Sequence, residues 1–396
     1  MIERSTFALV HHAASHARAV VLLGITAARR LRSNPDVLAV HLRRHWKYGP
    51  HLRVTVCAAD RERVRDSMTA EAQRLTIELA RLPAANEPPL DPHAYAELSA
   101  RLGRSELVPG PYLPLWPDRT VVWLPAVDDD DLIVDPRAQW VRDQVLDRFR
   151  TVLELALDRA GRDPARRLRD PLTLLILLAA SYPDGGLGHG YLSYTSHLED
   201  FLHDHDPDGR LRRRFADHAR TSQAQVRQLI QALVPDPTQP CWYRGEDELA
   251  RAFTEVLQDA WRLSAALAAE GGILPLLHPG YGVRAAEFGS DVLRKYRAAD
   301  DRTYSEFHAA LRQHTFTDEE GGRIFAAYRF LVNLLYSQLP LLDVAPAERF
   351  LLAYAITDAV QALTGRTWRD IFAMPDPAGV PAGPGESSGP QREVSP

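Results

Sequence analysis

Arginine and histidine are concentrated in residues 41–56, HLRRHWKYGPHLRVTV, where two strand-like runs flank a Tyr-Gly-Pro turn. Because side chains alternate between the two faces of a strand, the runs put His41, Arg43, His45, His51 and Arg53 on one face and mostly apolar side chains on the other. Guanidinium and imidazole groups at this density repel one another unless an anion lies between them, so the stretch predicts a site for phosphate, carboxylate or nucleic-acid backbone. The basic residues of this stretch are His41, Arg43, Arg44, His45, Lys47, His51 and Arg53.

The same alternation predicts a β-hairpin that turns at Tyr48-Gly49-Pro50 and belongs to a sheet covered on one side only. Leu38, Val40 and Leu42 would face the core, and the basic face would stay open. A structural explanation remains open beside the anion site. Solvated sheet faces often carry charge, and the arginines of the hairpin could simply pair with carboxylates.

A second informative stretch is GGLGHGYLSYTSHLEDF, residues 185–201. Ser196 and Glu199 have the spacing of a capping box, which predicts a helix that begins at His197. His197 would then stand in the first turn, beside unpaired backbone N–H groups that favour a phosphate or carboxylate. The glycine-rich approach is not a Walker loop, because no Gly-Lys-Ser or Gly-Lys-Thr follows it.

The first third of the chain predicts a ferredoxin-like unit. A strand, a helix, the hairpin, a helix capped by Asp60 and a closing strand follow one another in the order of that motif. The capped helix repeats Val64, Met68, Ala72, Leu75 and Leu79 at helical spacing. The other predicted elements are a strand over residues 7–12, a helix over 14–32, a short helix over 94–102 and the closing strand over 120–125.

The rest of the chain predicts helices, over residues 138–160, 171–181, 197–205, 211–233, 247–269, 318–339 and 346–363. The expected fold class is therefore α+β, with an N-terminal ferredoxin-like antiparallel sheet in residues 1–135 packed on a larger helical part in residues 136–374. Residues 375–396 are rich in Pro, Gly and Ser, which predicts a disordered tail.

Composition narrows the function classes. The net charge of −5 argues against indiscriminate nucleic-acid binding, although a local basic surface can still engage a folded RNA. No apolar run reaches the roughly eighteen residues of a membrane span, so a cytoplasmic protein without a membrane partner is expected. Cys57 and Cys241 are far apart and predict core thiols, not a disulfide framework or a zinc site, and no metal ligand set is expected.

These stretches carry a resemblance. Arg-His-Trp followed by Gly-Pro-His-Leu-Arg-Val, residues 44–54, resembles the opening hairpin of the small lantibiotic-dehydratase-like enzymes. That family includes dehydratase elimination domains, thiopeptide pyridine synthases and peptide aminoacyl-tRNA ligases. The Ser-x-x-Ser-His-x-Glu-x-Phe pattern of residues 193–201 and the helices of residues 323–363 are similar to segments of the same family. The resemblance implies biosynthesis of a ribosomally made peptide natural product.

Departures from the family pattern exclude one of its activities. Elimination domains carry a histidine four residues before an Asn-Arg pair, whereas this chain has Arg329 before Asn333, which Leu334 follows. Arginine does not shuttle protons at neutral pH, so glutamate elimination is not expected. The hairpin is instead closest to that of the peptide aminoacyl-tRNA ligases.

Ligase activity, as the resemblance implies it, joins an amino acid from aminoacyl-tRNA to the C-terminus of a carrier or precursor peptide, with ATP and Mg²⁺. His51, His197 and Arg53 would be the catalytic residues. The substrate would be bound by Arg43, Arg44, His45, Lys47, Ser193, Ser196, Arg329 and Asn333. Asp128 to Asp131 offer either a magnesium site near a triphosphate or a solvated loop.

Two alternatives stay open. One is a pyridine synthase, a cycloaddition enzyme that builds the pyridine of a thiopeptide from dehydrated residues and needs no nucleotide. The other is an inactive family member that holds a peptide or a tRNA for a partner, which the basic hairpin suits equally well. A homodimer is compatible with the sequence.

Overall fold

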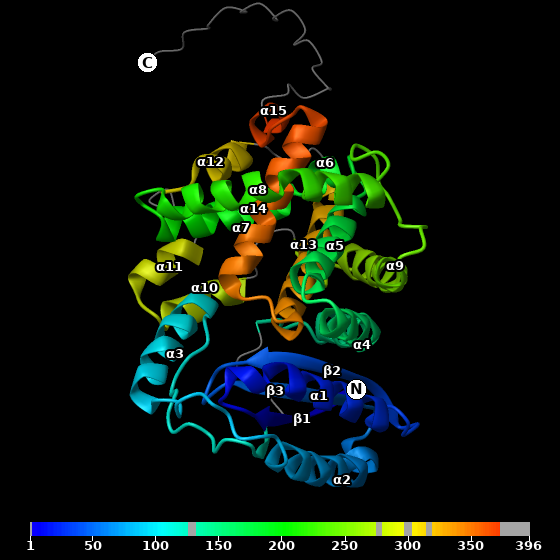
Figure 1. The fold of residues 1–396 in the computed structure, drawn as a ribbon, viewed down its shortest axis with the longest axis vertical. Coiled ribbons are helices and arrows are strands. Elements are labelled where there is room, and N and C mark those ends of the chain that lie inside the picture. The colour runs from blue at the N-terminus through cyan, green and yellow to red at the C-terminus, as the bar shows by residue number, and fades with distance from the viewer. Residues whose placement is uncertain (1, 126–131, 275–278, 297–302, 314–318, 373–396) are drawn as a thin grey trace, which may run out of the picture.

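The computed structural model describes residues 2–125, 132–274, 279–296, 303–313 and 319–372. Its architecture is α+β, as predicted, with a four-stranded antiparallel sheet near the N-terminus and a larger helical part above it (Figure 1). The four aspartates at 128–131 and the predicted tail at 375–396 lie outside the described residues. None of the described helices is long and apolar enough to cross a bilayer.

The sheet has the strand order β2-β3-β1-β4, all antiparallel, which is the order expected of a ferredoxin-like unit. Two helices pack on one face, where a Cβ at Gly24 would meet the side chains of Leu42 and Leu52. Asp60 caps the second of them by accepting a hydrogen bond from the Glu62 N–H, as predicted. The elements are β1 (Glu3–Val10), α1 (Ala17–Leu31), β2 (Val37–His45), β3 (His51–Ala58), α2 (Arg61–Ala80) and β4 (Val121–Trp123).

A bulge near the start of β2 changes which side chains face the core. Val37 pairs with Ala58 and Ala39 pairs with Cys57, so Leu38 is an extra residue on this strand. Its side chain is 38% exposed. The predicted alternation of Leu38, Val40 and Leu42 therefore fails at its first position and holds from Val40 onward.

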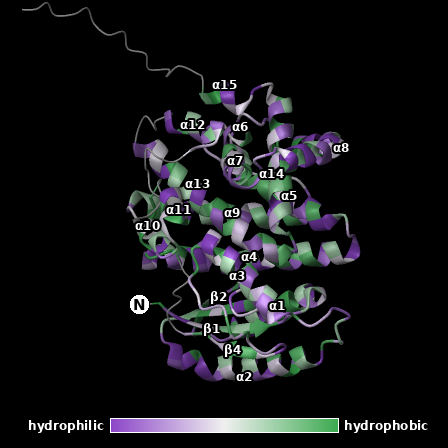
Figure 2. Ribbon diagram, turned by 90° about the vertical axis from the view of Figure 1, so that its left-hand side faces the viewer, coloured by the Kyte–Doolittle hydropathy of each residue, from purple (hydrophilic) through white to green (hydrophobic). Residues whose placement is uncertain are grey.

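The prediction that the sheet is covered on one side only is wrong. The helix α4 (Pro136–Arg162) packs along β2 on the face opposite α1, and all eight residues of β3 are buried. Figure 2 shows hydrophobic residues along β1 and β4, with α2 below them and α4 above the sheet. From α13 (Glu319–Gln338), Gln338 Nε2 donates to the Leu42 carbonyl at 3.3 Å. The basic face is thus an interface with the helical part.

Asp143 on α4 is the residue that lets this face be buried. Its carboxylate is fully buried and accepts hydrogen bonds from Arg4 Nε at 2.6 Å and Arg142 Nη2 at 2.9 Å. Cys57 Sγ lies 3.4 Å and His41 Nε2 lies 3.1 Å from its two oxygens. We call these five residues the Asp143 cluster. One carboxylate therefore ties three strands, β1, β2 and β3, to α4.

Three members of the Asp143 cluster, His41, Cys57 and Asp143, have potential metal-ligand atoms within 4.8 Å of one another. Two guanidinium groups already bind the carboxylate oxygens, and they would repel a cation. Burial and the nearby carboxylate also raise the pKa of the Cys57 thiol, which opposes thiolate formation. The Asp143 cluster is therefore a buried network of ion pairs and hydrogen bonds and not a metal centre.

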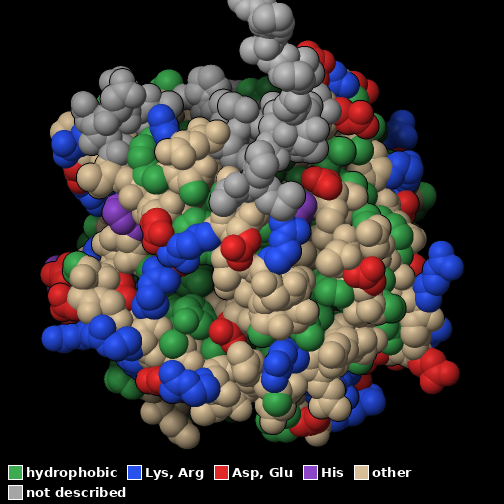
Figure 3. All heavy atoms as spheres, turned by 90° about the horizontal axis from the view of Figure 1, so that it is seen from above, with side chains coloured by type: hydrophobic (Ala, Val, Ile, Leu, Met, Phe, Trp, Pro, Cys, Tyr) green, Lys and Arg blue, Asp and Glu red, His purple; other side chains and the backbone are tan. Residues whose placement is uncertain are grey.

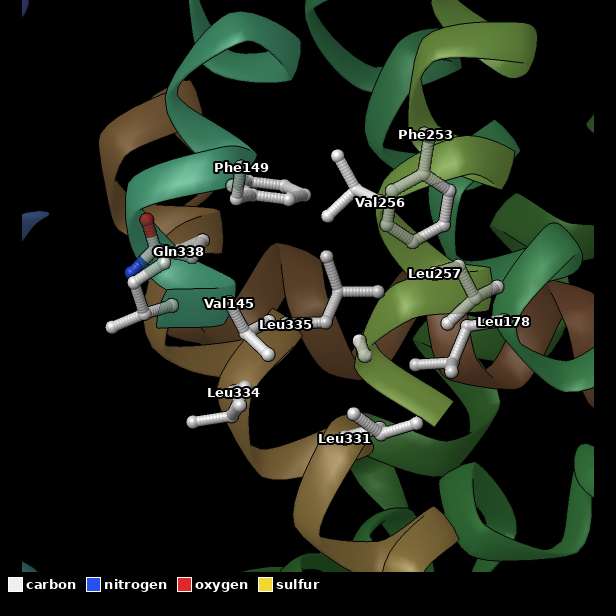
Figure 4. Close-up of a pocket in the computed structure, with 12 residues that line it drawn as sticks. Val145, Phe149, Leu178, Phe253, Val256, Leu257, Leu331, Leu334, Leu335 and Gln338 are labelled. Carbon is white, nitrogen blue, oxygen red and sulfur yellow. The ribbon is translucent and has the colours of Figure 1, made fainter. Parts of the chain in front are cut away.

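The helical part contains the predicted helices, most with ends within a few residues of those expected. Beyond α4 they are α5 (Arg166–Ala180), α6 (Leu187–Gly190), α7 (Leu192–His205), α8 (Arg210–Leu233), α9 (Glu248–Ala269), α13 and α14 (Pro346–Thr364). Its centre is apolar. A cavity of about 20 Å³ lies among α4, α5, α9 and α13, where Phe149, Phe253 and Leu335 converge (Figure 4). This space is too small and too apolar for a peptide substrate.

Short helices flank the sheet and the helical part. Helix α3 (Pro92–Glu106) is tied to α10 (Pro279–Ala286) and α11 (Ser290–Tyr296), because Arg104 donates to the Phe288 carbonyl and pairs with Asp291. Helix α12 (Glu306–Gln313) packs on α7 and on α15 (Trp368–Phe372). Helix α3 reaches the hairpin, because Glu106 at its end accepts a hydrogen bond from Trp46 Nε1.

Candidate functional site

The hairpin brings its predicted site residues together in pairs. Arg43 lies directly opposite Arg53, and His45 lies opposite His51, with ring centroids 5.3 Å apart. His51 Nδ1 donates to the Gly49 carbonyl at 2.8 Å, and its Nε2 accepts from Arg53 Nε at 3.3 Å. Burial, followed by the charge of Arg53, lowers the pKa of His51 to about 3. This imidazole is neutral and fully engaged, which does not suit the base role predicted for it.

Aromatic rings close the end of the hairpin. The backbone N–H of Trp116 donates to the Tyr48 carbonyl at 2.9 Å, and the Trp116 ring lies 4.9 Å from that of His51. Trp46 stacks on His45 at 5.4 Å and donates through Nε1 to Glu106 at 2.9 Å. The sequence did not identify Trp116 or Glu106 as site residues, because both come from a segment far along the chain that only the fold lays over the hairpin.

The turn itself is as predicted, and it needs its glycine. Gly49 has φ of +111°, a conformation that side chains with a Cβ rarely adopt. A Cβ there would also lie 3.1 Å from His12 Nε2. Lys47 sits at this turn with its ammonium 5.6 Å from the Tyr48 ring.

Arg44 does not join the other basic residues. It pairs with Leu52 in the register of the sheet and therefore faces the side of α1, away from Arg43. Burial lowers its pKa, and the carboxylate of Asp343 partly offsets this effect. Its predicted contact with the substrate is thus not supported by its position.

The predicted capping box on residues 196–199 is wrong. Helix α7 begins at Leu192, because the chain before it is already helical in α6 and Tyr194 anchors the first turn by donating to the Leu175 carbonyl. Ser196 instead bonds to His308, and Glu199 holds Arg212 through two hydrogen bonds. His197 consequently lies in the second turn, where the backbone N–H groups are already bonded, and cannot use a helix N-terminus to bind an anion.

His197 nevertheless faces a group of polar side chains. Its ring lies 5.0 Å from that of Tyr336 on α13. Burial lowers its pKa to about 3, helped by the positive charges of Arg349 and Arg329. Ser193 lies one turn earlier on the same face of α7. His197 is therefore a neutral hydrogen-bonding group in a positively charged environment.

Arg349 on α14 is a site residue that the sequence did not indicate, and its burial and geometry suit the binding of an anion or a carbonyl oxygen. Its guanidinium stacks 4.8 Å from the Tyr336 ring and 4.6 Å from the Phe350 ring, and burial lowers its pKa. Its Nε is buried and has no hydrogen-bond partner among the described residues. Glu106 interacts electrostatically with both Arg349 and Arg43, so it links the hairpin to the helical part.

Arg329, Asn333 and Tyr336 occupy one face of α13 at spacings of four and three residues. Arg329 interacts electrostatically with His197 and with Tyr281 from α10. Asn333 is exposed, so this face opens to solvent between them. The candidate site thus comprises two connected groups, named from here on the hairpin group (Arg43, His45, His51, Arg53, Trp46, Glu106) and the helical group (His197, Arg329, Asn333, Tyr336, Arg349).

Histidines with lowered pKa values predict loss of stability in mild acid. Burial holds the pKa of His11 at about 4 and that of His51 and His197 at about 3, well below the unfolded value near 6.5. Stability is then fully present above pH 6.5 and is lost as the pH falls, because the unfolded chain takes up protons first. We expect a loss of roughly 1–2 kcal/mol per histidine between pH 6.5 and pH 5 in urea unfolding.

The variant His11→Phe should reduce that pH dependence by the share of one histidine. Equal stability of the wild-type protein at pH 7 and pH 5 would contradict the neutral, buried state of these rings.

Comparisons with known proteins place the fold. No protein-family profile matches this sequence, and no curated protein sequence matches it. The structure of the pyridine synthase TbtD from thiomuracin biosynthesis resembles it with a TM-score of 0.66 at 20% identity, over 92% of this chain and 99% of that one. The structure of TsrL resembles it with a TM-score of 0.60 at 16% identity, over 95% of this chain and 100% of that one. At these identities the likeness establishes a shared fold.

Proposed function

We propose that this protein modifies a ribosomally made precursor peptide by closing a ring between dehydrated residues, as a pyridine synthase. The observation that carries the proposal is the end-to-end likeness of the fold to the pyridine synthase TbtD, 99% of whose chain is matched. Fold alone does not define chemistry, so the proposal also has to suit the side chains of the candidate site.

Ring closure of this kind has modest chemical needs, which the helical group meets. A backbone amide must exchange a proton, and the carbonyl carbon that enters the pyridine must lose its oxygen as water. The Arg349 guanidinium can polarise that carbonyl and stabilise negative charge on its oxygen. The neutral His197 can hold an amide N–H, and the Tyr336 ring offers a flat surface for an unsaturated residue.

The test is to incubate the purified protein with a peptide that contains two dehydroalanine residues and to follow the products by mass spectrometry. Aromatisation expels water and the amide substituent on the new ring, so the peptide mass should fall and pyridine absorbance should appear. No nucleotide is added. A peptide of unchanged mass would contradict the proposal.

A second candidate, peptide aminoacyl-tRNA ligase activity, is favoured by the hairpin residues Arg44, His45, Trp46, Gly49, Pro50 and His51. The positions of two residues expected to be catalytic in a ligase count against this candidate. His51 has both ring nitrogens engaged in hydrogen bonds, and His197 lies away from the start of α7. On the face opposite the sheet, shown in Figure 3, the Lys and Arg side chains of the described residues lie among Asp and Glu side chains, so a tRNA would have to bind elsewhere on the molecule.

The same assay separates the candidates. With ATP, Mg²⁺, an aminoacyl-tRNA and a carrier peptide, a ligase raises the peptide mass by one residue, whereas the pyridine synthase lowers the mass of the dehydrated peptide. Peptide binding without any change of mass would instead indicate a binding protein.

A further inference from the structure

A chain of hydrogen bonds, Ser196–His308–Ser305, joins α7 to α12 beside the helical group. Ser196 Oγ lies 3.0 Å from His308 Nε2, and Ser305 Oγ lies 2.7 Å from His308 Nδ1. The backbone N–H of His308 also donates to Ser305 Oγ at 3.3 Å. Both ring nitrogens are therefore held by hydroxyl groups, which fixes the orientation of the imidazole.

Packing keeps His308 in this place. The neighbouring Phe307 is buried, with its ring 5.3 Å from that of Trp368 and 5.4 Å from that of Phe372. On its other side, Glu306 accepts two hydrogen bonds from Arg369. Helix α12 is thus anchored to α15, and the hydrogen bonds to Ser196 and Ser305 do not have to hold it alone.

The chain also adjoins the candidate site. Ser196 directly precedes His197 on α7, and His308 is among the groups that lower the pKa of His197. Of the other imidazoles at the site, His51 has both nitrogens engaged. Burial lowers the pKa values of His45 and His197, which makes both rings poor proton carriers at neutral pH. His308 has hydroxyl groups on both nitrogens, and a hydroxyl can pass a proton in either direction.

We propose that His308, acting through the Ser196 hydroxyl, supplies and removes the proton that the reacting amide of the substrate exchanges, with Ser305 as a positioning residue. In the forward step the Ser196 O–H bond breaks as its proton passes to the amide oxygen, and a new O–H bond forms with the proton of His308 Nε2. His308 starts this step as an imidazolium and ends it as a neutral imidazole, while the amide becomes protonated on oxygen. The amide N–H proton then returns through Ser196 to His308, which leaves the iminol form of the amide and restores the imidazolium, and no electrons are exchanged. This inference rests on the proposed ring closure.

The experiment compares four variants in the dehydrated-peptide assay. Both His308→Gln and Ser196→Ala should lower the rate by about a hundredfold without a matching loss of melting temperature. The conservative Ser196→Thr should keep most of the rate, and His218→Gln on the exposed face of α8 should keep all of it. Rates that stay unchanged in His308→Gln, or that fall only as far as stability falls, would overturn the proposal.

A pH profile tests the role of Ser305. If Ser305 only orients the imidazole, Ser305→Ala should shift the pH optimum of the rate and leave part of the activity. An unshifted profile would count against a positioning role. Labelling of Ser196 by a serine-directed phosphonate would overturn the relay, because it would show a nucleophile in its place.

If the wild-type protein leaves the dehydrated peptide unchanged, the proposed ring closure is contradicted. The proton relay through Ser196 and His308 is then tested without the substrate. Imidazole ¹⁵N NMR then reports which nitrogen of His308 carries the proton. Ser196→Ala and Ser305→Ala should each change the tautomer ratio and the titration midpoint of His308. Spectra identical to those of the wild-type protein would overturn the relay.

Discussion

Replacing Arg349 with methionine should lower kcat/KM for peptide modification by about a hundredfold to a thousandfold. The guanidinium is stacked on Tyr336 and Phe350, and its buried Nε has no hydrogen-bond partner among the described residues. A cation held in this way is oriented before the substrate arrives, which is the condition under which such a group stabilises developing negative charge. Methionine keeps the length of the apolar stem, so the packing against both rings should survive.

Two further variants sharpen this test. Arg349→Lys keeps a positive charge but loses the planar fork, so it should recover only part of the rate. Arg323→Met, on the exposed face of α13, should leave the rate unchanged. Steady-state rates and melting temperatures are measured for all three proteins. Full activity of Arg349→Met would show that the helical group does not contact the reacting atoms.

Replacing Asp143 with alanine should lower the free energy of unfolding by about 3–5 kcal/mol. The carboxylate is fully buried and accepts from both Arg4 and Arg142, so its removal leaves two guanidinium groups without their counter-charge. Burial alone would raise the pKa of Asp143, but the hydrogen bond from His41, followed by the charges of Arg142 and Arg4, lowers it far below the ordinary value. The contribution of Asp143 to stability is therefore present above about pH 4 and is lost only in stronger acid. Urea unfolding at neutral pH measures the change.

The matched control is Asp259→Asn, which breaks the pair with Arg148 on the surface. Exposed pairs contribute little, so a change within about 0.5 kcal/mol is expected. If Asp143→Ala were no more destabilising than this control, the Asp143 cluster would not be what holds the sheet to α4.

The order of elements could be predicted from the sequence because local signals fix it. Asp60 and Asp247 cap their helices through side-chain hydrogen bonds, and Val64, Met68 and Leu75 are buried at the predicted helical spacing. Signals of this kind act over a few residues and need no knowledge of the fold.

The site could be predicted only in part, because its remaining members meet through long-range packing. Nothing near the hairpin indicates that Asp143 covers its basic face, and nothing near Arg349 indicates that Glu106 lies close by. The capping pattern at Ser196 does not mark the start of α7. The helix begins earlier, at Leu192, where Tyr194 in its first turn donates a hydrogen bond to the Leu175 carbonyl. Local patterns place side chains on faces, but tertiary contacts decide what those faces meet.

The burial of both faces of the sheet has a consequence for how this architecture can evolve. A sheet with one solvated face can be cut out and fused to other proteins, because its core is complete within itself. Here β3 is buried along its whole length, and Arg4 and Arg142 share a single carboxylate as their counter-charge. Exchange of either half between relatives should therefore succeed only when Asp143 and its cationic partners are exchanged as one inherited set.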